Sequence, residues 1–281
     1  KDIGEYAQRA RHCGKFGRDS AYVKENMGYG LTASFAAPRI GADRGPIYVG
    51  LSGIYNYTST MASSLQGWWR LNRNISEAGQ CLDSSGNNRH GTFASLSQRP
   101  SFSTSLYPST QVQTGSCTFD GGGSADDSTS VGTAATWDAI IGNNTADGST
   151  EKMTFAAWIY KTGDGENSFG RIIDFGDSDI MVYTDLTEKI YFGAKWDGAN
   201  LVQWRTTSTA FSLNEWTHMM VTYDATNSAN DPKIYINGVE QTVALYSGNQ
   251  TGAYYGIIGQ DAHIGNRLKD NWPMLLYGIQ F

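Results

Sequence analysis

The sequence lacks any hydrophobic run long enough to cross a bilayer. Its longest apolar stretches, such as the one from Phe155 to Tyr160, are far shorter than the roughly 20 residues that a membrane-spanning helix needs. Charged side chains are also sparse, at 17% of the chain, and the net charge is −6. Because this leaves no basic field to attract phosphate groups, we expect neither membrane insertion nor a nucleic-acid partner.

The residue types that most often carry catalysis are few and scattered. Four histidines and three cysteines show no zinc-binding spacing, no Cys–His pair and no Ser–His–Asp set. The acidic clusters lie at strand ends or in turns, and no strand carries the alternating acids that a glycosidase needs. The glycines at 121–123 precede a Ser/Asp loop rather than a helix, unlike a phosphate-binding loop. We therefore predict no catalytic residues and no enzymatic activity.

The three cysteines, Cys13, Cys81 and Cys117, leave at least one thiol unpaired within the chain. Two alternatives are open for Cys81 and Cys117, which flank the first predicted strands. They form a disulfide, or they are two buried free thiols.

What the sequence does contain is the texture of an all-β protein. It has 33 glycines and 16 tyrosines, with many Ser, Thr and Asn residues, which suits short strands joined by tight turns. In the segment Lys233–Glu240, the pair Asn237-Gly238 predicts a hairpin with a type I′ turn. Residues alternate with the period of a strand from Met153 to Tyr160, and further strands are predicted at 171–175, 180–183, 189–194, 201–206, 216–223, 262–265 and 275–281.

Residues 1–63 have a different pattern and are predicted to form an irregular N-terminal arm. A short helix is expected at Ile3–Arg11, whereas Met27–Leu51 has Gly or Pro every few residues and indicates an extended segment. The arm holds too many aromatic and aliphatic residues for a solvated linker. We expect it to dock on another subunit or scaffold, although a loose terminus is the alternative. Because the chain opens at Lys1 without a signal region, we also expect a processed product.

From residue 64 onward, a series of motifs resembles the laminin G-like and pentraxin-like members of the concanavalin A-like superfamily. The motifs occur in the family's order and approximate spacing. They are GWWRLN (67–72), LDSSGNNRHGTF (82–93), CTFDG (117–121), MTFAAWIY (153–160), RIIDFGD (171–177), NEWTHMMVTYD (214–224), KIYINGV (233–239) and HIGN (263–266).

The resemblance implies a jelly-roll sandwich of two antiparallel sheets over residues 64–281. Family members continue past the HIGN-like strand to a complete closing strand, so the last strand is expected to extend beyond Phe281. Within the sandwich, Trp158 and Trp216 are predicted to fill the space between the sheets. His218 shares a face with Trp216 and is predicted to be a structural histidine rather than a ligand or base.

Calcium is the one cofactor that the sequence suggests. Loops at a sandwich rim present carboxylate and backbone oxygens, which calcium prefers, and relatives often bind calcium there. The candidate ligands are Asp120, Asp174, Asp177 and Asp179, with ordinary turn chemistry as the alternative.

A glycan site needs an exposed aromatic platform flanked by amides and charged groups. Two segments offer that composition, and the candidate binding residues are Trp196, Asp197, Asn200 and Arg205, together with Tyr254 and Tyr255 near Gln260 and Asp261. Trp204 is a further candidate platform, with a core position as its alternative.

These observations favour a non-catalytic structural and binding module on an extracellular or virion surface. In this hypothesis the arm anchors a lectin-like sandwich to a larger assembly, and the sandwich binds glycans or a cell surface. The texture resembles sandwich modules of bacteriophage particles. A free-standing secreted lectin is the first alternative, and a glycoside hydrolase is a remote one because the same superfold carries such enzymes.

Overall fold

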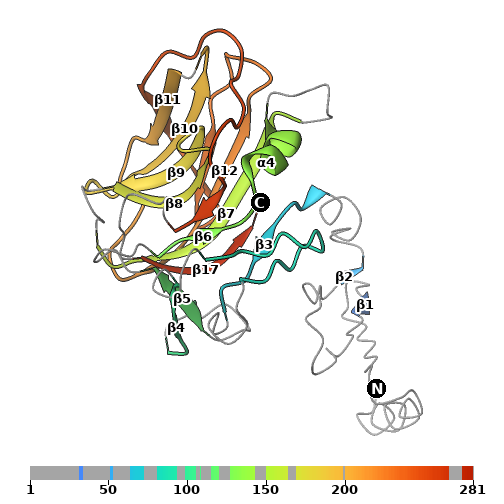
Figure 1. The fold of residues 1–281 in the computed structure, drawn as a ribbon. Coiled ribbons are helices and arrows are strands. Elements are labelled where there is room, and N and C mark those ends of the chain that lie inside the picture. The colour runs from blue at the N-terminus through green and yellow to red at the C-terminus, as the bar shows by residue number, and fades with distance from the viewer. Residues whose placement is uncertain are drawn as a thin grey trace, which may run out of the picture. The chain divides into compact units, whose positions relative to one another are not determined.

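The computed structural model describes residues 64–72, 81–93, 99–105, 108, 115–119, 127–142, 150–163, 169–198, 200–265 and 274–280, and two short strands at 32–33 and 51–52. Gly67–Asp83 and Asn87–Phe281 form one compact unit, which is a sandwich of two antiparallel sheets (Figure 1). The predicted all-β sandwich of two antiparallel sheets is thereby confirmed.

The first sheet has seven strands in the order β15-β11-β10-β9-β8-β16-β6. Their bounds are β15 Val243–Ser247, β11 Asn200–Thr206, β10 Ile190–Trp196, β9 Ile180–Asp185, β8 Phe169–Phe175, β16 His263–Ile264 and β6 Thr129–Ser130. Hairpin-connected neighbours such as β9 and β10 give this sheet antiparallel pairing throughout.

The second sheet has eight strands, in the order β14-β13-β12-β7-β17-β5-β4 with β3 also paired to β17. Their bounds are β14 Val239–Gln241, β13 Lys233–Ile236, β12 Trp216–Asp224, β7 Lys152–Lys161, β17 Met274–Gln280, β5 Ser116–Phe119, β4 Ser101–Ser103 and β3 Trp68–Trp69. The predicted hairpin at Asn237-Gly238 joins β13 to β14, and both residues have positive φ, as a type I′ turn requires.

Strand alternation decides what fills the core. Along β12 buried and half-buried residues alternate strictly, with Thr217, Met219 and Val221 facing the first sheet. Trp158 and Trp216 therefore lie on the outer face of the second sheet, half-buried, and the prediction that they fill the core is wrong. Alternation shows which residues share a face but not which face is covered. His218 shares the outer face with Trp216, as predicted, and its ring packs on Trp158 at 5.2 Å.

The core tryptophans are instead Trp69, Trp137, Trp196 and Trp204, each almost fully buried. Trp137 comes from the helix α4, Ala134–Ile141, whose first turn is capped by the Thr133 hydroxyl accepting from the Thr136 amide. The Trp137 ring meets Phe175 edge-on at 5.2 Å, so this helix closes one end of the core.

The remaining predictions for the fold concern the cysteines and the arm. Cys81 and Cys117 are both buried and are not joined by a disulfide, which agrees with the second of the two alternatives. In the N-terminal segment, β1 (Thr32–Ala33) pairs with β2 (Leu51–Ser52). The rest of the arm, including Cys13 and the expected helix at Ile3–Arg11, lies outside the described residues. Over the described part of the chain, no helix has the length and apolar character needed to span a membrane.

Candidate functional site

The outer face of the seven-stranded sheet carries an aromatic and polar cluster that is separate from the core. Along β11, Val202, Trp204 and Thr206 are buried in the sandwich, so the residues between them point outward. The register places Tyr191 opposite both Arg205 and Tyr183, and these side chains therefore share the outer face. We call this cluster the tyrosine–arginine face; it comprises Met181, Tyr183, Asp185, Tyr191, Gln203, Arg205, Tyr246 and Ser247.

The rings of this face are packed against one another across three strands. Tyr183 stacks on Tyr191 at 4.6 Å with an interplanar angle of 15°, and Tyr246 meets Tyr191 edge-on at 5.1 Å. The Arg205 guanidinium lies 4.3 Å above the Tyr246 ring and 5.8 Å from the Tyr191 ring. A cation over an aromatic ring is attracted by the ring's negative face, so Arg205 holds Tyr246 in place.

Hydrogen bonds fix the polar atoms between these rings. The Tyr191 hydroxyl donates to Asp185 Oδ2 at 2.7 Å and accepts from Arg205 Nη1 at 3.0 Å. Gln203 Nε2 donates to the Tyr183 hydroxyl at 2.8 Å, and the Ser247 hydroxyl donates to Gln203 Oε1 at 2.7 Å. A network in which each member has a partner loses little side-chain freedom on binding a ligand, so the face is preorganised.

The pKa values of the titratable groups on this face are shifted away from neutral pH. Burial raises the pKa of Tyr183, and burial together with the bond to Asp185 raises the pKa of Tyr191, although Arg205 opposes the rise. Burial acts to raise the pKa of Asp185, but hydrogen bonds from Thr187 and Tyr191 outweigh it and hold that pKa below its usual range. The face therefore presents a cation, a carboxylate and neutral phenols across the physiological range.

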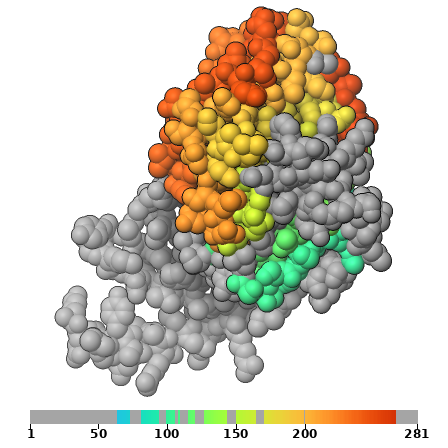
Figure 2. All heavy atoms as spheres, turned by 90° about the vertical axis from the view of Figure 1, so that its left-hand side faces the viewer, coloured from blue at the N-terminus to red at the C-terminus, as the bar shows by residue number. Residues whose placement is uncertain are grey.

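Tyr246 and Arg205 are the parts of the cluster that solvent can reach. Tyr246 is 49% exposed and Arg205 is half-buried, whereas Tyr183 and Tyr191 are almost fully buried. Figure 2 views the molecule from the side on which β9 to β11 lie in Figure 1, and the yellow and orange atoms of this part of the chain make up much of its coloured surface. An exposed ring beside fixed donors and acceptors is the chemistry with which proteins hold sugars, because a sugar ring has an apolar C–H face and a polar edge.

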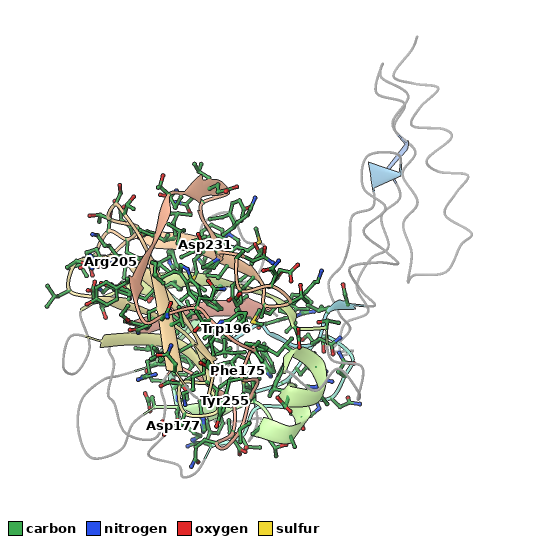
Figure 3. The ribbon with its side chains drawn as sticks, turned by 90° about the horizontal axis from the view of Figure 1, so that it is seen from above. Phe175, Asp177, Trp196, Arg205, Asp231 and Tyr255 are labelled. Carbon is green, nitrogen blue, oxygen red and sulfur yellow. The ribbon has the colours of Figure 1, made fainter. Side chains whose placement is uncertain are left out.

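Most of the residues predicted to bind a glycan come together elsewhere, at the rim around the β10–β11 turn. Tyr254 forms an isolated antiparallel β-bridge with Trp196, and the Tyr255 amide donates to the Lys195 carbonyl at 3.0 Å. Asn200 Nδ2 donates to the Asn249 carbonyl at 2.8 Å. Arg205 lies at the other end of β11 and is well apart from Tyr255 and Asp177 in Figure 3.

The prediction of an exposed aromatic platform at this rim is wrong. Trp196 is 1% exposed and donates to the Tyr223 hydroxyl at 3.1 Å, and Tyr254 is 4% exposed. The Trp196 ring fills the core because the even-numbered positions of β10 face the other sheet, and the Tyr254 ring packs against it at 5.9 Å. Asp197 and Asn200 are exposed and Tyr255 is half-buried. Trp204 also faces the core, where its indole N–H donates to Asp231 at 2.8 Å.

Two of the four carboxylates predicted to bind calcium, Asp174 and Asp179, are held by protein groups. Asp174 forms an ion pair with Arg171 and accepts from the Ser178 amide at 2.7 Å, and Asp179 pairs with Lys195 at 2.7 Å. Asp177 is exposed in the turn between β8 and β9, and Asp120 lies outside the described residues.

Within the described part of the chain, no group of three or more His, Cys, Asp or Glu side chains is placed to hold a metal ion. The three described aspartates therefore do not gather into the predicted ligand set, since Asp174 is paired with Arg171 and Asp179 with Lys195. Burial raises the pKa of Asp179 even though Lys195 opposes the rise. Calcium binding as such stays a prediction.

Arg205 is among the binding residues predicted from the sequence, whereas its neighbours Tyr183, Tyr191 and Tyr246 are not. The alternation in LVQWRT (201–206) contained a usable signal, because it separates Trp204 from Arg205 onto opposite faces. The strands β9 and β10 carry large apolar or aromatic residues at both parities, so their sequences do not show which face is outer.

A comparison with protein families finds a match for part of the sandwich. Residues 138–275 match the model of the concanavalin A-like lectin/glucanases superfamily. This confirms the resemblance seen in the sequence motifs. None of the curated proteins matches the chain significantly.

Several solved structures show a distant likeness to the chain, with low sequence identity and TM-scores below 0.5. Botulinum neurotoxin type C, described as interacting with two ganglioside molecules, is 15% identical with a TM-score of 0.47, over 78% of this chain and 47% of its own. Trypanosoma rangeli sialidase in complex with sialic acid is 12% identical with a TM-score of 0.48, over 99% and 36%. Domain 4 of an extracellular arabinanase from Geobacillus stearothermophilus, in complex with arabinotriose, is 12% identical with a TM-score of 0.43, over 77% and 90%. The chain thus spans less than half the length of the neurotoxin and the sialidase.

Proposed function

We propose that this chain is a non-catalytic glycan-binding module and that its tyrosine–arginine face contacts the sugar. The observation that carries the proposal is the exposed Tyr246 ring, fixed by Arg205 beside the linked side chains of Gln203 and Ser247. The family to which residues 138–275 match includes lectins by its description, which agrees with this assignment.

Each part of the face has a distinct task in this proposal. The open side of the Tyr246 ring stacks on the C–H face of a sugar, since its other side is covered by the Arg205 guanidinium. Arg205 and Gln203 present N–H groups to hydroxyl or carboxylate oxygens at the sugar edge. Tyr191 and Asp185 act as positioning residues because they hold Arg205 from behind.

We further propose that the sandwich is displayed on an extracellular or virion surface, with residues 1–63 anchoring it to other subunits of a larger assembly. Support comes from the sequence of that segment, which holds more aromatic and aliphatic residues than a solvated linker. Deleting residues 1–63 separates this proposal from a free-standing lectin. Anchoring requires that incorporation into the assembly fails while glycan binding persists; unchanged incorporation would contradict it.

A glycoside hydrolase is the remote alternative. The buried acids Asp174 and Asp179 are each bound to a cationic side chain, an arrangement that favours ion pairing over proton transfer to a sugar. Hydrolysis of laminarin or agarose, abolished by replacing a pair of carboxylates, would overturn the non-catalytic assignment.

A glycan array that covers several sugar classes tests the binding proposal. Wild-type protein is expected to retain at least one class, and Tyr246→Ala is expected to lose it. Tyr235→Ala is a matched control, because Tyr235 is a half-buried tyrosine on β13 of the other sheet. An array that stays blank with wild-type protein, or equal binding by both variants, would count against the proposed site.

A further inference from the structure

The strand β15 forms an edge of the seven-stranded sheet that differs from the other sheet edges. It is five residues long, VALYS, without charge or proline. At the opposite edge β6 has two residues, and its Ser130 already exchanges backbone hydrogen bonds with Thr92. In the other sheet, β14 carries Glu240 and β4 has three residues. Short or charged edges resist pairing with another strand, and β15 has neither protection.

The backbone groups that face away from β11 can be assigned from the pairing register. The Thr242 carbonyl accepts from the Thr207 amide at 2.9 Å, so the groups of Thr242 face β11. Because backbone groups alternate in direction along a strand, those of Val243 and Leu245 face outward. Over the described part of the chain, β15 pairs with β11 and with no other strand.

The side chains along this edge are apolar and exposed. Leu245 is 53% exposed, Tyr246 is 49% exposed, and Ala244 is exposed as well. Residues 241–260 contain no Asp, Glu, Lys or Arg, although the chain as a whole has a net charge of −6. Two copies can therefore approach along this edge without placing like charges opposite each other.

We propose that β15 pairs antiparallel with β15 of a second copy of this chain, across a twofold axis at Ala244. In this register Val243 lies opposite Leu245 of the second copy, and both outward-facing residues of each strand exchange their backbone hydrogen bonds. The strand is thus complementary to itself. Each copy also places its exposed Leu245 opposite Val243 of the other copy, so apolar side chains of the two strands cover each other.

The pairing joins the two seven-stranded sheets into one continuous sheet. Ala244 lies opposite Arg205 in the register, so both face the outer side. Three strand spacings of about 4.8 Å then separate the two Arg205 residues, which places them about 14 Å apart on one surface. If the glycan-binding proposal holds, the dimer is bivalent; this consequence rests on that proposal, whereas the pairing itself does not.

Sedimentation equilibrium over a range of concentrations tests the dimer. Five-residue edges bury less area than a standard interface, so the dissociation constant is expected in about the micromolar range. Wild-type protein should reach twice the mass of one chain, and Leu245→Lys should stay at the mass of one chain. Leu186→Lys is a matched control, because Leu186 is a leucine 59% exposed in the β9–β10 turn, and it should dimerise like the wild type.

A cross-linking variant gives a second readout that does not depend on weakening the edge. Ala244→Cys, in a Cys13→Ser background, should form a disulfide-linked dimer on mild oxidation, because residues opposite each other across an antiparallel pair meet the Cα spacing of a disulfide. Leu186→Cys in the same background should not. A wild-type protein that stays monomeric up to about 1 mM, a Leu245→Lys dimer, or equal cross-linking of both cysteine variants would overturn the proposal.

Discussion

The two outer faces of the sandwich are both aromatic, but they are built differently. On the seven-stranded sheet, hydrogen bonds connect Tyr191 to Asp185 and Arg205, and Tyr183 to Gln203. The Tyr246 ring packs under the Arg205 guanidinium. On the eight-stranded sheet, Tyr160 pairs with Trp216 at 5.4 Å and Trp158 with His218 at 5.2 Å, in ring-to-ring contacts.

The difference shows that aromatic content alone does not mark a candidate binding face. The rings of the second face are half-buried against one another, whereas Tyr246 presents half of its surface to solvent beside fixed polar groups. Affinity for a polar ligand depends on donors and acceptors that are held in place before binding. This difference is why the proposed ligand site lies on the seven-stranded sheet.

The largest expected effect separates stability from binding on the two sides of a single strand. Trp204→Ala should lower the free energy of unfolding by about 3–5 kcal/mol, because it removes a fully buried ring. The neighbouring Arg205→Ala should cost about 1 kcal/mol, since Arg205 is half-buried on the outer face. Denaturant unfolding measures both values. Equal losses would show that the outer face is a second structural core.

How far the sequence alone predicts this structure depends on how local the signal is. The Asn237-Gly238 hairpin and the alternation of β12 were predictable because turn chemistry and strand period are properties of adjacent residues. The positions of the tryptophans were not predictable in this way. Trp158 and Trp196 both lie in regular strands, but the Trp158 side chain faces outward and the Trp196 side chain faces the core. The strand β15 was missed altogether, because its VALYS sequence lies among polar and glycine-rich neighbours.

The tyrosine–arginine face was beyond sequence reasoning for a different reason. Tyr183, Tyr191 and Arg205 meet only because the register sets Tyr191 between the other two, and no spacing in the chain specifies that register. Arg205 is predicted from its position in the sequence beside aromatic residues. The prediction that Trp196 is an exposed platform is wrong because the second sheet buries this side chain.

A smaller effect tests whether the polar network orders the outer face. Tyr191→Phe removes the hydroxyl that joins Asp185 to Arg205 and should destabilise the fold by about 1–2 kcal/mol, since two hydrogen bonds to charged groups are lost. Trp216→Phe on the other face is the comparison and should alter glycan binding by no measurable amount. A Tyr191→Phe protein with unchanged stability and unchanged binding would show that the network has no role.

The smallest expected effect is a difference in pH response between the two faces. Burial lowers the pKa of His218, so the unfolded chain takes up this proton first as the pH falls below about 7. Stability should therefore decrease from pH 7 down to the lowered pKa of His218, and His218→Gln should lessen the decrease. Urea unfolding at pH 7.5, 6.5 and 5.5 measures it. Identical pH slopes for the two proteins would contradict the assignment.

Calorimetric titration of an array-positive glycan into matched variants of the two faces tests the account most directly. Arg205→Ala should weaken binding at least about tenfold, which corresponds to the loss of a charge-assisted hydrogen bond of about 1.4 kcal/mol or more. Trp158→Ala, on the eight-stranded sheet, should bind like the wild type once its folding is verified. Retained binding by Arg205→Ala together with lost binding by Trp158→Ala would move the site to the other face and contradict the account.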